Sequence, residues 1–292
     1  MLPIRVVARR TGWQVCGRLG LRWCQSSAGL VLQESYDDGA IHRLILNNRK
    51  KGNAMSLKLI EELDDKLQKC AAESATRAII LAAQPPIFSA GHDLRELRTE
   101  TGLSYHAKVF DRCTKMMSFV QDTPVPVIAE VKGIAAAAGC QLVASCDIVV
   151  AADNCRFSTP GIRAAGLFCS TPGVAVARAL PRKVALDMLL TGDEISAAEA
   201  YRAGLVSRLV PEDKVSEEAM NVARKIASYS KPVVSMGKLF FYMQVEMTRK
   251  DAYRSAERVM VENLRLRDCQ EGIDSFVEKR PPTYTHSTDK AH

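Results

Sequence analysis

With 292 residues, the chain is long enough to bury a sizeable core as one large domain or two small ones. Its 47% hydrophobic and 25% charged residues are ordinary for a globular protein, and no apolar run approaches the roughly 18–20 residues of a membrane-spanning helix. The net charge of +7 is mild and, beyond residue 33, mixed in sign. We therefore expect neither a membrane span nor a nucleic-acid partner.

Most of the excess positive charge lies in the first 33 residues. This segment has no lysine and no acidic residue, but it has five arginines: Arg5, Arg9, Arg10, Arg18 and Arg22. An arginine-rich, acid-free start with serines near its end is typical of a mitochondrial targeting peptide. We predict such a peptide over residues 1–28, cleaved between Ser26 and Leu30, and a location in the mitochondrial matrix. A disordered basic tail is the alternative.

Nine cysteines are scattered along the chain without a Cys-x-x-Cys pair or a Cys/His spacing. In a reducing compartment such residues remain free thiols and pack as small apolar groups. The sequence therefore predicts no metal site and no disulfide framework.

Short apolar runs alternate with helical patterns in the first half of the chain. Ser56 begins a helix whose residues Ile60, Leu63 and Leu67 share one face. Four runs predict strands, at 39–48, 76–83, 125–133 and 147–153. Alternation of this kind predicts an α/β fold with mostly parallel pairing. Glu130 and Lys132 fall on one face of a predicted strand, so we expect them to form a structural pair.

Helical patterns dominate the last third. Ser196 with Glu199 forms a capping box, and Gly204 ends that helix. Residues 230–247 and 251–267 are helical with wide apolar faces, which predicts packing on the core or on a neighbouring subunit. We divide the mature chain into a core (29–230), a C-terminal helical region (231–280) and a flexible polar tail (281–292).

Two segments place small residues where a strand turns into a helix: "FSAGHDL" (88–94) and "AAAAGC" (135–140). The first turn of a helix leaves backbone N–H groups unpaired, and small residues let a ligand approach them. Two such groups that converge on one oxygen form an oxyanion hole, which stabilises developing negative charge. Tight packing without a ligand is the other reading of the same pattern.

Four motifs in order resemble the crotonase (enoyl-CoA hydratase/isomerase) family. They are "LNNRKKGNAMS", "FSAGHDLREL", "PVIAEVKGIAAAAGCQLVASCDIVVA" and "LLTGDEISAAEAYRAGLV". The resemblance implies a spiral of ββα units with a C-terminal helical region that forms trimers or hexamers. It also implies a coenzyme A thioester as ligand, with no cofactor apart from the coenzyme A of the substrate.

The same resemblance implies roles for individual residues. The backbone N–H groups of His92 and Ala138 match the two donors of the family's oxyanion hole. Basic side chains that could meet the nucleotide phosphates are Lys50, Lys51 and Arg95, although each could equally be a solvated surface charge. Asp93 is expected to cap the turn that follows it, and Asp147 to hold the loop after the helix of the hole.

Two carboxylates that this family's hydratases use are replaced here. Water addition to an enoyl thioester needs a base at the β-carbon and an acid at the α-carbon. The matching positions hold Gln141, which does not titrate usefully, and Gly161, which has no side chain. Because each lost acid or base typically costs ~10²–10⁴-fold in rate, we expect efficient hydration to be absent. The family's double-bond isomerases also use a carboxylate at position 161, so that activity is disfavoured too.

Cys169 occupies a position where some relatives carry a reactive aspartate. A thiol there could act as a nucleophile or base if its pKa were lowered, or it could simply pack in the core. The catalytic candidates are therefore Gln141 and Cys169, whereas the His92 side chain is expected to point away from the hole. No Gly-x-Ser-x-Gly elbow indicates a serine hydrolase.

Two functions follow from the resemblance. The first is an acyl-CoA-binding protein of mitochondrial fatty-acid or lipid metabolism that runs a slow or different thioester reaction. The second is a non-catalytic regulator that acts through acyl-CoA binding or through mixed oligomers with active relatives.

Overall fold

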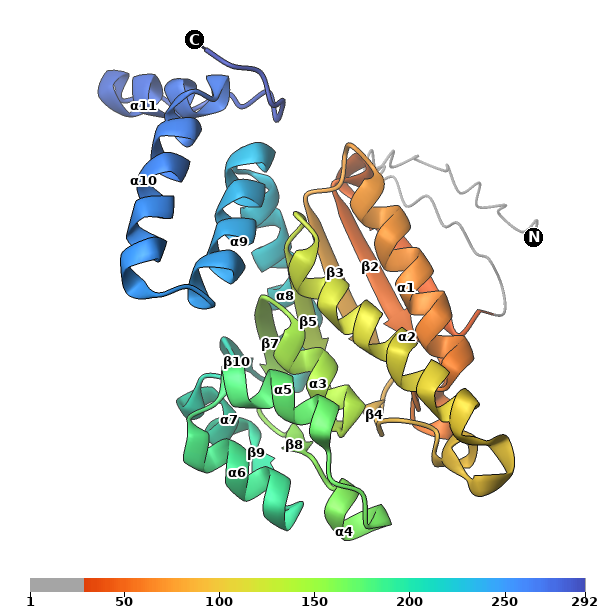
Figure 1. Cartoon of the computed structure of the whole chain (residues 1–292). Helices are drawn as coiled ribbons and strands as arrows, with labels where there is room; N and C mark the ends of the chain where they lie inside the picture. Colours follow the sequence, from red (N-terminus) through yellow and green to blue (C-terminus); the bar gives the residue numbers. More distant parts are fainter. Residues whose placement is uncertain (1–28, 292) are drawn as a thin grey trace, which may run out of the picture.

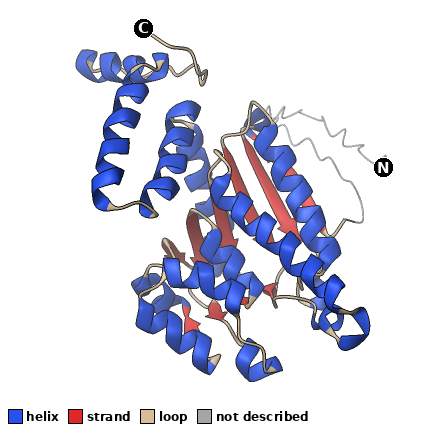
Figure 2. Ribbon diagram, viewed as in Figure 1, coloured by secondary structure: helices blue, strands red, loops and turns tan. Residues whose placement is uncertain are grey.

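The computed structural model describes residues 29–291, and the predicted targeting peptide (1–28) lies outside them. Two sheets and their covering helices form the body, and a group of helices at the C-terminal end stands apart from it (Figure 2). None of the helices in the described part of the chain is both long and apolar enough to cross a membrane.

The larger sheet has six strands in the order β1-β2-β3-β5-β7-β10. Only β1 and β2 pair antiparallel, and every other neighbouring pair is parallel, as the alternating pattern predicted. The central strands are mostly apolar on both faces, Glu130 of β5 excepted, because helices cover both sides. The bounds are β1 Val31–Tyr36, β2 Ile41–Leu46, β3 Ala78–Ala83, β5 Val127–Val131, β7 Ile148–Ala152 and β10 Arg208–Val210.

The smaller sheet has four short strands in the order β4-β6-β8-β9. The first three pair in parallel, and β9 closes the edge antiparallel to β8. Because β4 and β6 each lead into a candidate junction of the oxyanion hole, this sheet aligns the two junctions. Its strands are β4 Ile87–Ser89, β6 Ile134–Ala136, β8 Arg156–Ser158 and β9 Glu194–Ser196.

Helices cover both faces of the larger sheet. In Figure 1, α1 and α2 lie in front of the strands, and α8 lies behind them, in contact with β3, β5 and β7. Within the body the helices are α1 Leu57–Ala72, α2 Leu103–Asp122, α3 Ala138–Ser145, α4 Gly161–Ala165, α5 Ser170–Ala179, α6 Arg182–Thr191, α7 Ala197–Ala203 and α8 Val215–Ala227. Short 3-10 turns are η1 Asp37–Gly39, η2 Arg49–Lys51, η3 Leu94–Leu97, η4 Thr99–Thr101 and η5 Glu212–Lys214.

The predicted helix starts are found where the caps indicated. Ser56 accepts a hydrogen bond from the Leu59 N–H at the start of α1. Ser196 and Glu199 form the reciprocal capping box of α7, which ends at Gly204 in the left-handed conformation. The predicted apolar face of α1 is fully buried against β1, β2 and β3.

The C-terminal helices are α9 Lys231–Val245, α10 Arg249–Leu264 and α11 Arg267–Glu278. Figure 1 shows α10 and α11 well away from the body, while α9 contacts α2. A buried lysine on α9, Lys238, anchors this region to the body. Its Nζ lies 2.8 Å from an Asp147 carboxylate oxygen, and it donates to the carbonyls of Val120 and Val125 at 2.8 and 2.9 Å.

The expected pair between Glu130 and Lys132 needs correction. Glu130 does not pair with Lys132: Arg43 of β2 reaches past β3 and donates to both Glu130 carboxylate oxygens at 2.8 Å, while Lys132 donates to Ser216. A planar guanidinium matches a buried carboxylate better than an ammonium does.

The tail beyond residue 280, predicted to be flexible, makes specific contacts with α11. The buried Asp268 carboxylate accepts hydrogen bonds from the backbone N–H groups of Thr285 and His286 at 2.8 and 2.9 Å. Its polar composition suggested disorder, but the same polarity satisfies a buried acid.

Candidate functional site

The site is an apolar cavity of about 360 Å³ between the smaller sheet and helices α2 to α5. It is lined by Ala90, His92, Leu94, Leu97, Phe110, Ala137, Ala138, Pro160, Gly161, Ala164, Ala165, Leu167, Phe168, Cys169, Ser170, Thr171 and Pro172. This wall contains no Asp, Glu, Lys or Arg, and His92 and Cys169 are its titratable side chains. Such a cavity suits an apolar chain.

Both predicted junctions meet at one end of this cavity. Gly91 has φ +88°, and a Cβ placed on it would lie 2.7 Å from the Ala137 Cβ and 3.3 Å from the Ala138 nitrogen. Only glycine fits this approach, because another residue would both strain the backbone and overlap its neighbour. The residue after it, His92, is thereby brought beside the first turn of α3.

The two predicted donor amides are free. Within the described residues, neither the His92 nor the Ala138 backbone N–H donates a hydrogen bond, whereas the Ala137 N–H donates to the Ser158 carbonyl at 3.0 Å. Ala137 has φ +48° and ψ −117°, which is rare for a residue with a Cβ. Strained backbone of this kind clusters at functional sites. Two unpaired amides on adjoining segments are the arrangement that an oxyanion hole needs.

The His92 side chain is held against neighbouring groups. Its Nδ1 lies 3.3 Å from the Met55 carbonyl oxygen, and its ring packs edge-on against Phe110 with centroids 5.2 Å apart. Because a carbonyl only accepts, Nδ1 carries the proton and Nε2 is bare. Nε2 is buried and has no partner in the described chain. Burial lowers the pKa of His92, so the ring is neutral at physiological pH.

Gln141 lies one turn beyond Ala138 and is 6% exposed. Its backbone N–H donates to the Ala137 carbonyl at 2.9 Å, but its side-chain Oε1 is buried without a hydrogen-bond partner in the described chain. Leaving a buried polar group unpaired costs ~1–3 kcal/mol. Gln141 is not among the residues that line the cavity, so this predicted catalytic residue lies behind the cavity wall.

Gly161 lacks a side chain, and the space that a side chain would need is already occupied. A Cβ at this position would lie 2.4 Å from the Leu167 carbonyl oxygen and 2.7 Å from Cys169 Sγ. The Leu167 N–H donates back to the Gly161 carbonyl at 3.0 Å and closes the α4 turn. The space of a side chain is therefore filled by the 167–169 segment, and a glutamate would enter only if this segment moved.

Cys169 lies in the cavity wall and is 7% exposed. Burial raises the pKa of its thiol, opposed by a hydrogen bond with the Gly161 backbone, so the protonated thiol dominates near neutral pH. It precedes α5 and follows Phe168, whose ring is half-exposed at the cavity. The lowered pKa that would favour a nucleophilic thiolate is not found here.

The three predicted phosphate-binding cations lie outside the cavity wall. Arg95 and Lys51 both reach the buried Asp93 carboxylate, at 2.8 and 3.6 Å, and the nearby Lys50 is exposed. Arg95 holds the pKa of Asp93 below its usual value. Asp93 also accepts from the Arg95 N–H and caps η3, which confirms the predicted cap. Arg95 and Lys51 thus meet at one carboxylate.

Asp147 has a wider role than the predicted loop anchor. Its carboxylate accepts from the Val127 N–H at 2.6 Å and from the Tyr242 hydroxyl at 2.8 Å, in addition to its contact with Lys238. It therefore ties the end of α3 to β5 and to the C-terminal helices. No cluster in the described residues brings together three or more His, Cys, Asp or Glu side chains able to hold a metal.

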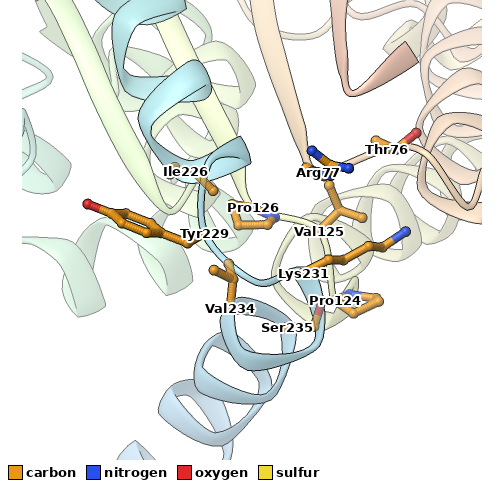
Figure 3. A pocket seen from close by; sticks show the side chains of 10 residues that line it. All are labelled: Thr76, Arg77, Pro124, Val125, Pro126, Ile226, Tyr229, Lys231, Val234 and Ser235. Atoms are coloured by element: carbon orange, nitrogen blue, oxygen red, sulfur yellow. The ribbon is translucent and has the colours of Figure 1, made fainter. Parts of the chain in front are cut away.

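A second hollow, between the body and the start of α9, has two cations at its edge (Figure 3). Arg77 donates to the Ala227 carbonyl at the end of α8, and Lys231 donates to the Ser74 carbonyl just beyond α1. Both cations thus cap helix C-termini. With about 10 Å³ of room, this hollow holds a water at most.

Sequence reasoning missed part of the cavity wall. Phe110 comes from α2, and Leu167 and Phe168 come from the loop between α4 and α5. The buried series Val109, Cys113, Met116 and Val120 could have located α2, since it follows helical spacing. Nothing in the sequence signals that the loop returns to Gly161.

The fold and the comparisons with known proteins define a member of the enoyl-CoA hydratase/isomerase family. The model of that family matches residues 37–287, so the chain belongs to it, and the predicted crotonase fold with its C-terminal helices is confirmed. The sequence is 54% identical over 287 residues to human enoyl-CoA hydratase domain-containing protein 3, mitochondrial, covering 95% of this chain and 93% of the relative. It is 45% identical to the Danio rerio protein of that name, covering 94% of each chain.

Solved structures agree. The crystal structure of human enoyl coenzyme A hydratase domain-containing protein 3 superimposes with a TM-score of 0.85 and 51% identity over 87% of this chain and 100% of that one. An enoyl-CoA hydratase from Mycobacterium smegmatis matches with a TM-score of 0.85 and 42% identity, over 88% and 99% of the two chains.

Proposed function

We propose that this protein binds acyl-CoA thioesters in mitochondrial fatty-acid or lipid metabolism and does not hydrate enoyl-CoA efficiently. In this proposal the thioester oxygen lies between the His92 and Ala138 amides, and the acyl chain fills the apolar cavity. In the same proposal, Lys50, Lys51 and Arg95 meet the nucleotide phosphates of coenzyme A. The coenzyme A of the substrate is the only cofactor-like group required.

A single observation carries this proposal: two residues with unpaired backbone N–H groups line a cavity whose wall has no carboxylate. The donors stabilise negative charge on a thioester oxygen. Hydration additionally needs a group that removes a proton from water and a group that delivers one to carbon. Gln141 does neither, and the place of a side chain at 161 is filled by Leu167 and Cys169.

A paired measurement tests the proposal. Titration calorimetry with butyryl-CoA should give saturable binding, and crotonyl-CoA hydration should run at least ~10⁴-fold slower than in a family hydratase with both carboxylates, assayed in parallel. Ala164→Trp should abolish binding by filling the cavity from an exposed position. Ala72→Trp, at an exposed helix position outside the cavity, is the matched control and should bind normally.

The hydration assay and the binding assay can each contradict a different part of the proposal. Hydration at an ordinary hydratase rate would show that another group replaces the missing carboxylates. Absence of binding to any acyl-CoA would remove the ligand assignment. Turnover of a different thioester reaction, such as decarboxylation or hydrolysis, would leave the ligand assignment intact and name the chemistry.

Exposed apolar side chains on the C-terminal helices favour assembly into trimers or hexamers. They include Phe241, Met243 and Val245 on α9, Tyr253, Met260 and Val261 on α10, and Phe276 and Val277 on α11. A monomer rarely exposes so much apolar surface in one region. The same surface supports the second candidate function, a regulator in mixed oligomers, which sizing of the protein alone and with an active relative would separate from a homo-oligomer.

The mitochondrial assignment has two supports. Residues 1–33 carry five arginines and no acid, and several relatives bear the word mitochondrial in their names. We place the mature protein in the matrix. Fusing residues 1–33 to a fluorescent reporter should direct that reporter to mitochondria, and replacing the five arginines with glutamine should leave it in the cytosol.

A further inference from the structure

Met55 is hydrogen-bonded through both of its backbone groups to the segment that contains His92. The Met55 N–H donates to the Gly91 carbonyl at 2.8 Å, and His92 Nδ1 donates to the Met55 carbonyl at 3.3 Å. Met55 and His92 thereby form an isolated parallel bridge between two segments of the chain. Because the Met55 side chain is fully buried, Met55 offers a fixed support to the two residues that it binds.

One peptide plane joins Gly91 to His92. In a planar trans peptide, the C=O and N–H groups point in opposite directions. The C=O of this plane belongs to Gly91 and accepts from Met55, so the His92 N–H points to the side away from Met55. This N–H has no partner within the described residues, and His92 lines the cavity. The direction of the donor therefore depends on the contacts with Met55.

Without a second contact, this peptide plane could turn with little resistance. Gly91 has φ +88°, and glycine populates positive and negative φ about equally. A turned plane would present the Gly91 carbonyl, an acceptor, where a thioester oxygen needs a donor. The His92 side chain attaches the other end of the same plane to Met55. Its ring packs edge-on against Phe110 with centroids 5.2 Å apart, which limits its own rotation.

We propose, resting on the acyl-CoA binding proposed above, that the His92 imidazole is a positioning residue for the oxyanion hole. Its hydrogen bond to the Met55 carbonyl holds the Gly91–His92 peptide in the orientation that offers the His92 N–H to a thioester oxygen. The ring acts through its own backbone and does not itself touch the ligand.

Two matched ligands separate the thioester oxygen from the rest of the molecule. Butyryl-CoA carries this oxygen, whereas S-butyl-CoA is the thioether in which a CH₂ group replaces the C=O. The ratio of their dissociation constants, measured by titration calorimetry, reports the contact with the oxygen alone. For the unaltered protein we expect butyryl-CoA to bind roughly 2- to 10-fold more tightly, which is the usual net effect of a hydrogen bond.

Two substitutions of His92 have the same shape and differ in one donor. His92→Asn places its NH₂ group at the same number of bonds from Cα as Nδ1, so it can still donate to the Met55 carbonyl. His92→Leu has a methyl group there and donates nothing. We expect His92→Asn to keep most of the preference for butyryl-CoA, and His92→Leu to bind the two ligands with nearly equal affinity.

Phe110→Leu is the control for the lost ring contact. It removes the aromatic neighbour of His92 but leaves the hydrogen bond to Met55, so it should keep the preference for butyryl-CoA. An undiminished preference in His92→Leu would overturn the proposal. Loss of the preference in both His92 variants would assign it to the ring instead of the hydrogen bond. Binding of neither ligand by His92→Leu would show that the contact supports the whole site, and either of these results also overturns the proposal.

The unaltered protein distinguishes this inference from the binding proposal. If it binds both ligands equally, coenzyme A binding stands, but the oxygen does not lie at the His92 N–H and the positioning role is overturned. If it binds neither ligand, the acyl-CoA assignment is removed together with the positioning role.

Discussion

The two sides of the cavity differ in how tightly the chain defines them. On the donor side, Gly91 has no room for a side chain, since a Cβ there would lie 2.7 Å from the Ala137 Cβ, and α3 is fixed at its far end by Asp147, which is 15% exposed. The opposite side is the 161–168 segment, which is largely exposed and contains the unconstrained Gly166. The segments that would hold an oxyanion are thus tightly packed, whereas the segment that would surround the acyl chain has room to adapt. Positioning donors demands accuracy within a few tenths of an ångström, whereas enclosing an apolar chain does not.

The strongest test of this contrast removes the anchor of the donor side. Lys238→Met should lower the free energy of unfolding by ~3–5 kcal/mol, because it leaves the Asp147 carboxylate, which is only 15% exposed, without its cation. Chemical denaturation measures the loss. The double variant Lys238→Met with Asp147→Asn should recover a large part of it, and additive losses in the double variant would show that the two residues are not coupled.

A matched pair of glycines gives the next largest difference. Gly91→Ala should destabilise by ~3 kcal/mol or more, since it adds an overlap with Ala137 to the strain of a positive φ. Gly166→Ala also has a positive φ, but it meets nothing within 4 Å and should cost only ~1 kcal/mol. Equal losses would contradict a difference in rigidity between the two sides.

Removing a ring from the adaptable side should affect binding more than folding. Phe168 is 44% exposed, so Phe168→Ala should change stability by less than ~1 kcal/mol. The ring contributes apolar contact to the acyl chain, and its loss should weaken binding of an octanoyl thioester ~5–10-fold. Calorimetry with acyl chains of increasing length measures the effect, which should vanish for acetyl-CoA. Tyr201→Ala, a similarly exposed aromatic residue outside the cavity, is the control.

The smallest expected effect is a pH dependence of the free energy of unfolding that arises from His92. Burial lowers its pKa in the folded protein, so the unfolded chain binds more protons between that value and about 6.5. Stability is therefore fully present above about pH 6.5 and falls as the pH drops below it, by at most ~1.4 kcal/mol per pH unit. His286 shares this direction. His92→Phe should flatten the dependence only in part, and an unchanged slope would mean that the His92 ring titrates as in the unfolded chain.

The donor side was predictable from the sequence because its signal is local. Small residues after two apolar runs indicate free backbone donors, and the structure brings both segments together. The mostly parallel pairing and the caps at Ser56 and Ser196 followed from periodicity and from nearest neighbours for the same reason.

The other side of the cavity, formed by residues 161–169, could not be predicted from the sequence. Its geometry depends on residues 167–169 folding back onto Gly161. Gly161 signals the lack of a side chain, but only the placement of Leu167 and Cys169 shows that the space is already filled. Glu130 gave a comparable error. Its neighbour two residues along the strand was visible in the sequence, whereas the guanidinium two strands away was not.

The hydrogen bonds between the C-terminal tail and Asp268 determine where the chain can be shortened. Shortening the protein after residue 280 would remove Thr285 and His286 and leave an acid that is 1% exposed without their N–H groups. The composition of the final dozen residues suggests that they are dispensable. Removing them should nevertheless destabilise the packing of α10 against α11. A clone designed for crystallisation should keep them.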